Sequence, residues 1–225
     1  NYLIKKIVKK LDLNLSGYTV LTEAGTGNFI YTGIIALISK AEYVIIWIKD
    51  TEHGKAKKIK KEFEDLAQGL GYKNFHVRVN ERSIKDISSS DIITNLGHIR
   101  PLDKLFLSQT KKNAVISLMC EKWELRSQDI DIDYCRKKQI KVSGTWENHP
   151  ELKIFDNCGY LVAKLCFDFG FEIYQNDILV ISNDKFGETI FKKLKKFEPN
   201  SIELKKTNEI KEIRNKPELI IIADY

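Results

Sequence analysis

Residues 178–194, ILVISNDKFGETIFKKL, carry the pattern that decides the fold class. Four apolar residues are followed by a short polar turn, one glycine and a helical pattern rich in lysine. A strand, a turn and a helix in this order form the unit of nucleotide-binding α/β folds. When the stretch is aligned with the G-x-G-x-x-G turn of such folds, the three positions are Ser182, Asp184 and Gly187, so only the last glycine is present.

The same alternation of apolar runs and helical patterns continues over most of the chain. Runs that are apolar on both faces are typical of buried parallel strands. We therefore expect an α/β fold of two Rossmann-like or flavodoxin-like units, with mostly parallel sheets, joined by a long helix. Strands are expected at 18–22, 43–48, 75–79, 91–95, 114–119, 141–144, 177–182, 201–206 and 218–224, and further helices at 29–39, 54–70, 185–197 and 207–214.

The domain organisation follows from the same pattern. Residues 1–148 are expected to form a flavodoxin-like substrate domain and 171–225 an incomplete Rossmann-like nucleotide-binding unit. Residues 149–170 are expected to form the linking helix, because apolar residues recur there at intervals of three and four. Pro150 suits its first turn and Gly170 its end.

Composition excludes several classes of protein. The chain has 225 residues, of which 43% are hydrophobic and 30% charged, with a net charge of +6. Its lysines lie in separate runs with helical spacing, which favours solvated helix faces over a nucleic-acid surface. Four cysteines without CxxC spacing favour reduced thiols in the cytoplasm, and no metal pattern is present. No apolar run reaches the roughly 20 residues that a membrane span needs.

The first candidate site is TEAGTGNFIYTG at 22–33, between an expected strand and an expected helix. Its two glycines allow a tight turn, and a helix N-terminus can hold an anion. Glu23 would repel a pyrophosphate, which favours a small anion or a substrate over a dinucleotide. A glycine turn chosen for steric reasons is the alternative. The expected substrate contacts are Gly25, Thr26, Gly27 and Asn28.

The second candidate is TNLGHIRPLD at 94–103, beyond the carboxyl end of another expected strand. His98 can exchange protons near neutral pH and is the candidate acid/base. Arg100 can hold a carboxylate or phosphate with its two-pronged guanidinium, and Asn95 and Gly97 complete the expected substrate site. The alternative is a capped loop with a surface arginine.

Two further polar clusters follow strands, MCEKWELRSQ from 119 and GTWENHP from 144. In the first cluster, glutamate–arginine pairing as scaffold is an alternative to catalysis. In the second cluster, helix capping is the alternative. The candidates are Glu121 as a second catalytic group, and Trp123, Arg126 and His149 as substrate contacts.

The turn at 182–187 is the expected place of a cofactor, NAD or NADP. Glu203 lies about 20 residues after the start of the motif, where an acid would meet the ribose hydroxyls. Asp184 would place a negative charge where the pyrophosphate approaches. The candidate cofactor contacts are Ser182, Asp184, Phe186, Gly187 and Glu203.

The stretch DIITNLGHIRPLDKLFLSQTKKNAVISLMCEKWELRSQDIDIDYCRKKQIKVSGT, followed by HPELKIFDNCGYLVAKL, resembles the D-2-hydroxyacid dehydrogenases of the formate/glycerate dehydrogenase group. The resemblance covers roughly residues 91–205 and implies a catalytic domain, a long helix and the start of an NAD-binding domain. The glycine fingerprint of the family is reduced to Gly187. The arginine, glutamate and histidine that act in the family belong to a part of the NAD domain that this sequence does not contain, so no catalytic role is carried over.

The leading functional hypothesis is an NAD(P)-dependent oxidoreductase-like protein that acts on a small polar or acidic substrate in an interdomain cleft. A cytoplasmic location and a homodimer are considered with it, and nucleic-acid and membrane partners are not expected. One alternative is a non-redox ligand-binding or regulatory protein with a degenerate Rossmann unit. Another is a transferase or lyase that acts on a nucleotide or sugar derivative. The fold class alone does not decide among them.

Overall fold

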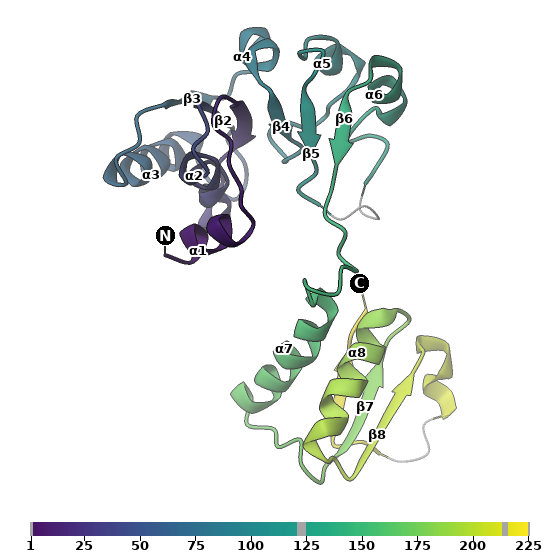
Figure 1. The fold of residues 1–225 in the computed structure, drawn as a ribbon. Coiled ribbons are helices and arrows are strands. Elements are labelled where there is room, and N and C mark those ends of the chain that lie inside the picture. Colours follow the sequence, from purple (N-terminus) through teal and green to yellow (C-terminus); the bar gives the residue numbers. More distant parts are fainter. Residues whose placement is uncertain (1, 121–124, 213–215, 225) are drawn as a thin grey trace. The chain divides into compact units, whose positions relative to one another are not determined.

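The structure, a computed structural model, describes residues 2–120, 125–212 and 216–224. The chain divides into two compact units, Asn1–Thr145 and Trp146–Tyr225, each built around its own parallel sheet (Figure 1). The α/β class expected from the sequence is confirmed. Within the described ranges, no helix combines the length and the apolarity that crossing a bilayer requires.

The first unit has a six-stranded parallel sheet with the order β3-β2-β1-β4-β5-β6. This is the strand order of the Rossmann fold. The strands are β1 (Thr19–Glu23), β2 (Tyr43–Ile48), β3 (Phe75–Val79), β4 (Ile92–Thr94), β5 (Val115–Ser117) and β6 (Lys141–Ser143). The helices are α1 (Tyr2–Lys10), η1 (Gly27–Ile30), α2 (Tyr31–Ile38), α3 (Ala56–Gly69), α4 (Ile84–Ser89), α5 (Lys104–Ser108) and α6 (Ile132–Lys138).

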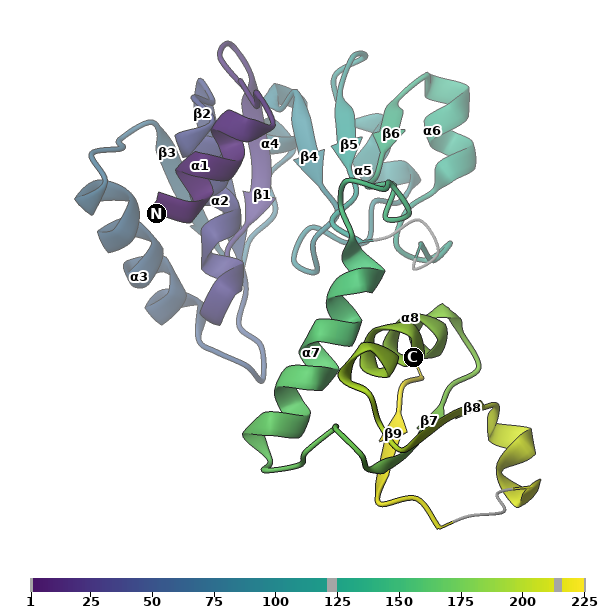
Figure 2. The same cartoon turned by 60° about the horizontal axis from the view of Figure 1, so that its bottom comes forward.

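Helices lie on both faces of this sheet, α2 and α3 on one and α4 to α6 on the other (Figure 2). The face under α4 to α6 is packed along the sheet by residues such as Leu21, Ile93 and Ile116. On the opposite face, the core formed with α2 and α3 is built mainly on β1 to β3. Of the described residues of β4 to β6, only Ile92 packs against that core.

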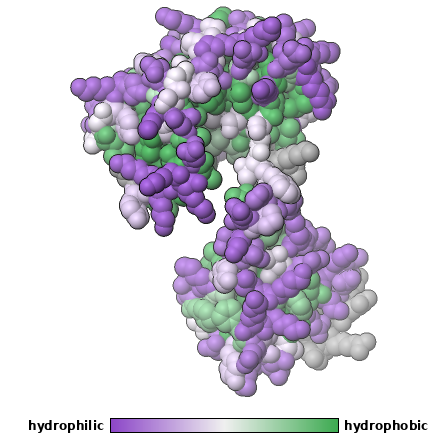
Figure 3. All heavy atoms as spheres, viewed as in Figure 1, coloured by the Kyte–Doolittle hydropathy of each residue, from purple (hydrophilic) through white to green (hydrophobic). Residues whose placement is uncertain are grey.

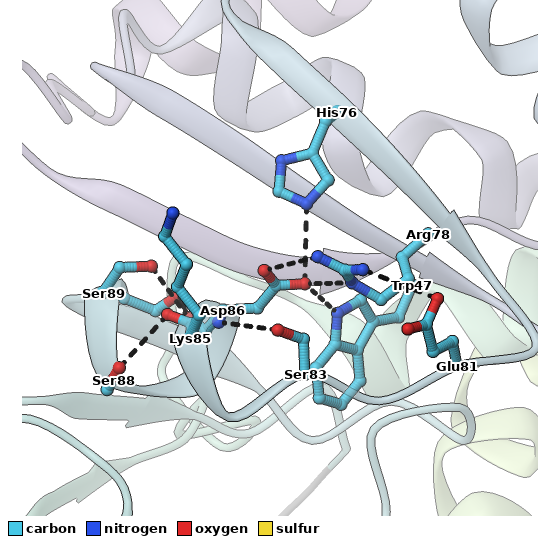
Figure 4. Close-up of polar contacts among 10 residues, drawn as sticks. Trp47, His76, Arg78, Glu81, Ser83, Lys85, Asp86, Ser88 and Ser89 are labelled. Carbon is cyan, nitrogen blue, oxygen red and sulfur yellow. Dashed lines mark hydrogen bonds and ion pairs between the residues drawn. The ribbon is translucent and has the colours of Figure 1, made fainter.

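Helix α4 is fixed to the sheet by the buried carboxylate of Asp86 (Figure 4). Arg78 of β3 donates two hydrogen bonds to it, from Nε to Oδ2 at 2.6 Å and from Nη2 to Oδ1 at 2.9 Å. The indole Nε1 of Trp47 donates to Oδ2 at 2.8 Å, and Nε2 of His76 lies 3.5 Å from the same oxygen. One charge of α4 therefore holds β2, β3 and the helix together.

The second unit has a three-stranded parallel sheet with the order β8-β7-β9. Its first strand lies between the second and the third, as in the flavodoxin order 2-1-3-4-5. The elements are α7 (Ile154–Asp168), β7 (Asp177–Ile181), α8 (Lys185–Leu194), η3 (Lys195–Phe197), β8 (Ser201–Lys205), η4 (Thr207–Glu212) and β9 (Leu219–Ile222).

Helix α7 begins at Ile154, four residues after the proline that was expected in its first turn. Lys153 adopts the left-handed conformation, with φ +51°, so the backbone cannot continue as a right-handed helix through this residue. The helix packs on α8 within the second unit. A Cβ atom on Gly159 would lie 2.5 Å from Cβ of Lys193, which shows how closely the two helices approach.

The four cysteines are free thiols in the structure. Cys135 and Cys166 are buried, and burial raises the pKa of the Cys135 thiol to about 11. A thiol with such a pKa stays protonated at neutral pH and is a poor nucleophile. These two residues therefore serve as apolar packing groups.

Candidate functional site

The carboxyl edge of the six-stranded sheet brings two of the sequence candidates together. In this strand order the winding of the chain reverses between β1 and β4, and ligands of such folds bind beyond the strand ends at that point. The turn 25–28 follows β1, and the loop 95–101 follows β4. The strands meet closely there, because the hydroxyl oxygens of Thr22 and Thr94 lie 2.9 Å apart.

Glu23, the last residue of β1, holds the loop that carries His98. Its Oε2 accepts a hydrogen bond from the backbone N–H of His98 at 2.6 Å, and Nδ1 of the imidazole lies 3.6 Å from the same oxygen. Both side chains are largely buried, with 8% of Glu23 and 12% of His98 exposed. The carboxylate that was expected to repel a pyrophosphate is therefore engaged by a neighbouring loop.

Asn95 is buried and uses its amide within the protein. Its Oδ1 accepts from the backbone N–H of Met119 at 2.6 Å, and its Nδ2 donates to Sγ of Cys120 at 3.5 Å. The residue therefore joins the loop after β4 to the end of β5. Asn95 lies at the edge where the sequence predicted it, but both polar atoms of its amide are bonded within the protein.

Arg100 pairs with Asp129, with Nη1 2.9 Å from Oδ2. The Arg100 side chain is 37% exposed. A Cβ atom on Gly97 would lie 3.8 Å from Nη2 of Arg100, so the two residues are close neighbours. Arg82 supports the same loop, because its Nη2 donates to the carbonyl oxygen of Ile99 at 3.0 Å and also to that of Arg100. The loop around His98 is thus held by the carboxylates of Glu23 and Asp129 and by the guanidinium of Arg82.

A polar pocket of about 360 Å³ lies beside His98, at the carboxyl ends of β2 and β3. The other polar residues of this pocket were not among the candidates expected from the sequence. Each of them lies within three residues of the end of an expected strand. Their position after a strand could therefore have identified them from the sequence. They are Lys49, Asp50, Asn80, Glu81 and Arg82.

Asp50 holds the loop that follows β2 in place through two hydrogen bonds. Its Oδ1 accepts from the backbone N–H of Ala56 at 2.9 Å, and its Oδ2 accepts from Nδ2 of Asn80 at 2.9 Å. The Ala56 N–H is the main cause, and the Asn80 amide the second, of a pKa of Asp50 below its ordinary value. The carboxylate therefore stays charged near neutral pH and fixes the loop between β2 and α3.

The turn Gly25–Asn28 leads from β1 into η1 and α2. Gly27 has φ +59°, in the left-handed region, and a Cβ on it would meet nothing within 4 Å. Among the residues that the structure describes, no side chain caps the start of η1 or of α2. Thr26 and Asn28 are exposed beside this start. The backbone N–H groups of the turn are therefore suited to an anion.

Four candidates from the two later polar clusters remain: Glu121, Trp123, Arg126 and His149. Glu121 and Trp123 lie outside the described residues. Arg126 is exposed, and its carbonyl accepts from the N–H of Asp129. His149 belongs to the second unit, where its ring meets that of Trp146 edge-on at 5.3 Å.

The turn between β7 and α8 caps its own helix. Oδ1 of Asp184 accepts from the N–H of Phe186 at 2.8 Å, and Oγ of Ser182 accepts from the N–H of Gly187 at 3.2 Å. Asn183 beside it is bonded to Asp224, from Nδ2 to Oδ2 at 2.6 Å. Side-chain oxygens thus occupy the place at the helix start where a phosphate would bind.

Glu203 is the middle residue of β8, which runs from Ser201 to Lys205. Its carboxylate lies 4.0 Å from Nζ of Lys205 and is about half exposed. Phe186 packs its ring against Phe155 of α7 at 5.3 Å. Both residues are therefore accounted for by contacts within the second unit.

Replacing Gly187 with alanine is expected to destabilise the second unit by about 2 to 3 kcal/mol, because small-to-large changes in packed sites cost this much. A Cβ there would lie 2.3 Å from Cβ of Ser182 and 3.0 Å from Cδ1 of Leu204. Urea unfolding followed by circular dichroism measures the change. The double variant with Ser182→Gly should recover part of the loss, whereas Gly69→Ala, where a Cβ meets nothing within 4 Å, should be harmless. An unaffected Gly187→Ala would contradict this account of the turn.

No family model matches the sequence, and no curated protein matches it. Three solved structures illustrate what the fold is similar to. The A chain of dipicolinate synthase from Bacillus subtilis is 11% identical with a TM-score of 0.49, and the match covers 95% of this chain and 68% of that one. Shikimate 5-dehydrogenase from Listeria monocytogenes, in complex with shikimate and NAD, is 13% identical with a TM-score of 0.42, covering 64% and 50%.

NAD-dependent formate dehydrogenase from Staphylococcus aureus, in complex with NAD, is 10% identical with a TM-score of 0.36. The match covers 91% of this chain and 60% of that one. The chain thus spans between half and about two thirds of the length of these proteins.

Proposed function

We propose that the first unit binds a nicotinamide dinucleotide and a small polar or acidic substrate at its carboxyl edge, as an NAD(P)-dependent oxidoreductase. The observation that carries the proposal is the Rossmann strand order, with a glycine turn after β1 and His98 in a polar pocket at the same edge. Ligands of this fold bind at that edge.

The phosphates of the cofactor fit the turn Gly25–Asn28 better than the turn at β7–α8. The first turn has uncapped N–H groups and a glycine that leaves room for close approach. The second turn is filled by Asp184 and Ser182. A bound nicotinamide ring would supply the hydride chemistry, which belongs to the cofactor. The turn that was expected to hold the substrate is thus assigned to the cofactor.

His98 is assigned the proton transfer, because imidazole exchanges protons near neutral pH. Oε2 of Glu23 lies 3.6 Å from Nδ1 and holds the backbone N–H of the same residue, so the carboxylate is placed to face a protonated imidazole. Lys49 and Arg82 are the cations of the same pocket and would face the carboxylate of an acidic substrate, while Asp50 is engaged by Ala56 and Asn80, and Glu81 is the other acid of the lining. Asn95 positions the loop through Met119 and does not contact the substrate.

The experiment is a titration of the 225-residue chain with NADH and NADPH, followed by fluorescence and by thermal shift. Gly27→Asp is expected to weaken binding about tenfold more than Gly27→Asn, since only the aspartate places a negative charge at the phosphates. Both residues tolerate the left-handed conformation of this position. Asp184→Asn, which keeps a capping side chain, is expected to leave the affinity within about twofold.

Two outcomes of this titration have different meanings. If Asp184→Asn tightens binding and Gly27→Asp changes nothing, the cofactor sits at the β7–α8 turn. If the unmodified chain binds neither dinucleotide at millimolar concentration, the oxidoreductase proposal fails. The second candidate, a non-redox ligand-binding protein, is favoured by the self-capped start of α8, and it would then stand.

A further inference from the structure

A second pocket of the first unit lies on the sheet face that α2 and α3 leave uncovered. It has a volume of about 860 Å³, within the range of small-molecule sites. It extends across β1, β4, β5 and β6 and is bounded on one side by α2. None of the residues that line it also lines the pocket of His98. Figure 3 shows hydrophobic side chains at the surface of this unit among hydrophilic ones.

The floor of this pocket has a row of four hydroxyl groups. The strands pair in parallel with Thr94 opposite Ser117 and Ser117 opposite Ser143, and Thr22 is bonded to Thr94 across the next strand pair. All four residues line the pocket. Within the described part of the chain, no side-chain hydrogen bond is formed by Ser117 or Ser143, so their hydroxyls are free to bind a ligand.

The row next to the hydroxyls is apolar and ends in a cation. Val20 pairs with Ile92, Ile92 with Val115, and Val115 with Lys141, two residues before the hydroxyls on each strand and so on the same face. All four of these residues also line the pocket. The floor therefore offers an apolar strip beside a strip of hydrogen-bond donors, with Lys141 at one end.

The charges that line this pocket favour an anion. Among the described lining residues, Asp91 is the only carboxylate, and it is already neutralised. Its Oδ1 accepts from Nζ of Lys111 at 2.7 Å, and its Oδ2 accepts from the N–H of Thr19 at 2.9 Å. Lys141 is exposed, and the described residues give it no ion pair. The net positive charge complements a carboxylate.

We propose that this pocket binds a small ring-bearing carboxylate, with its ring on the strip formed by Ile92 and Val115. The carboxylate accepts hydrogen bonds from Ser117 and Ser143 and faces the ammonium group of Lys141. Hydroxyls and an ammonium together recognise a carboxylate, and an apolar strip two strands wide accommodates a six-membered ring. This site does not depend on the proposed oxidoreductase function.

The test is a fluorine NMR titration of the full chain with 4-fluorobenzoate, 4-fluorobenzamide and fluorobenzene. Fluorobenzoate is expected to bind with a dissociation constant of about 1 mM, the range of a ligand of this size. The double change Ser117→Ala with Ser143→Ala should weaken it about tenfold. Lys141→Gln should weaken fluorobenzoate about fivefold and leave fluorobenzamide unchanged. Ser88→Ala and Lys137→Gln, both on exposed helix positions, are the matched controls.

Three results would overturn the proposal. If fluorobenzene binds as tightly as fluorobenzoate and the serine and lysine variants have no effect, the face is an apolar surface without a carboxylate site. If none of the three probes binds, the pocket is not a small-molecule site, and this sheet face is left to a protein segment. If the chain self-associates in sedimentation and Val115→Lys abolishes the association, a second copy of the chain covers this face in place of a carboxylate.

Discussion

Replacing His98 with glutamine is expected to lower NAD(P)H-dependent turnover by about a hundredfold or more, the usual contribution of a general acid or base. Glutamine keeps the size and a hydrogen-bonding end but cannot exchange a proton at neutral pH. The backbone N–H of this residue still reaches Glu23, so the loop should keep its place. Steady-state rates with a panel of small 2-oxo acids and NADH or NADPH measure the change.

The control for this substitution is His53→Gln. His53 lies in a loop, and its side chain is 77% exposed. It should leave both turnover and melting temperature unchanged. Unchanged turnover in His98→Gln removes His98 from the chemistry, whereas no turnover by the unmodified chain, together with no dinucleotide binding, removes the oxidoreductase proposal itself.

Replacing Asp86 with alanine is expected to lower the free energy of unfolding of the first unit by about 3 to 5 kcal/mol, as for other buried ion pairs that lose one partner. The change removes both hydrogen-bond acceptors of the Arg78 guanidinium, which keeps only the 3.6 Å ion pair with the exposed Glu81, and it leaves the N–H of Trp47 without an acceptor. Guanidinium unfolding followed by circular dichroism measures it. Asp133→Ala, at an exposed pair with Arg136 on α6, should change stability by less than about 1 kcal/mol.

The same carboxylate gives stability a defined dependence on pH. Burial opposes the ionisation of Asp86, but hydrogen bonds from Arg78 and Trp47 outweigh it and hold the pKa of Asp86 below its ordinary value. A lowered pKa means that the stabilisation is fully present above the ordinary value of about 3.9 and is lost as the pH falls through the folded value. Asp86→Ala should therefore weaken the acid sensitivity of the first unit. An equal acid dependence in both proteins would contradict this assignment.

Local sequence patterns were sufficient to locate the strands. YVIIWI and FHVRV coincide with β2 and β3 at both ends, because β-branched and aromatic runs of this length suit a pleated, buried surface. The short helices α4 and α5, of six and five residues, were not expected, since one turn and a half gives little periodic signal. The start of α7 was misplaced because nothing local indicates that Lys153 takes a left-handed conformation.

Strand order and side-chain direction depend on residues far apart in the chain. The edge between β1 and β4 could be expected to carry ligands, but the contact of Glu23 with His98 spans 75 residues and only the fold reveals it. Asn95 shows the limit of residue types as a guide. An amide that suits a ligand also suits the free N–H of Met119, and the structure uses it there.

The buried indole of Trp47 can report on the packing of the first unit. Its N–H is bonded to Asp86 of α4, and its ring meets Phe106 of α5 edge-on at 6.3 Å, so both helices form its surroundings. An indole shielded from water emits at shorter wavelength than a hydrated one. Release of either helix is therefore expected to shift the emission of Trp47 to the red, whereas Trp146 of the second unit is already 63% exposed.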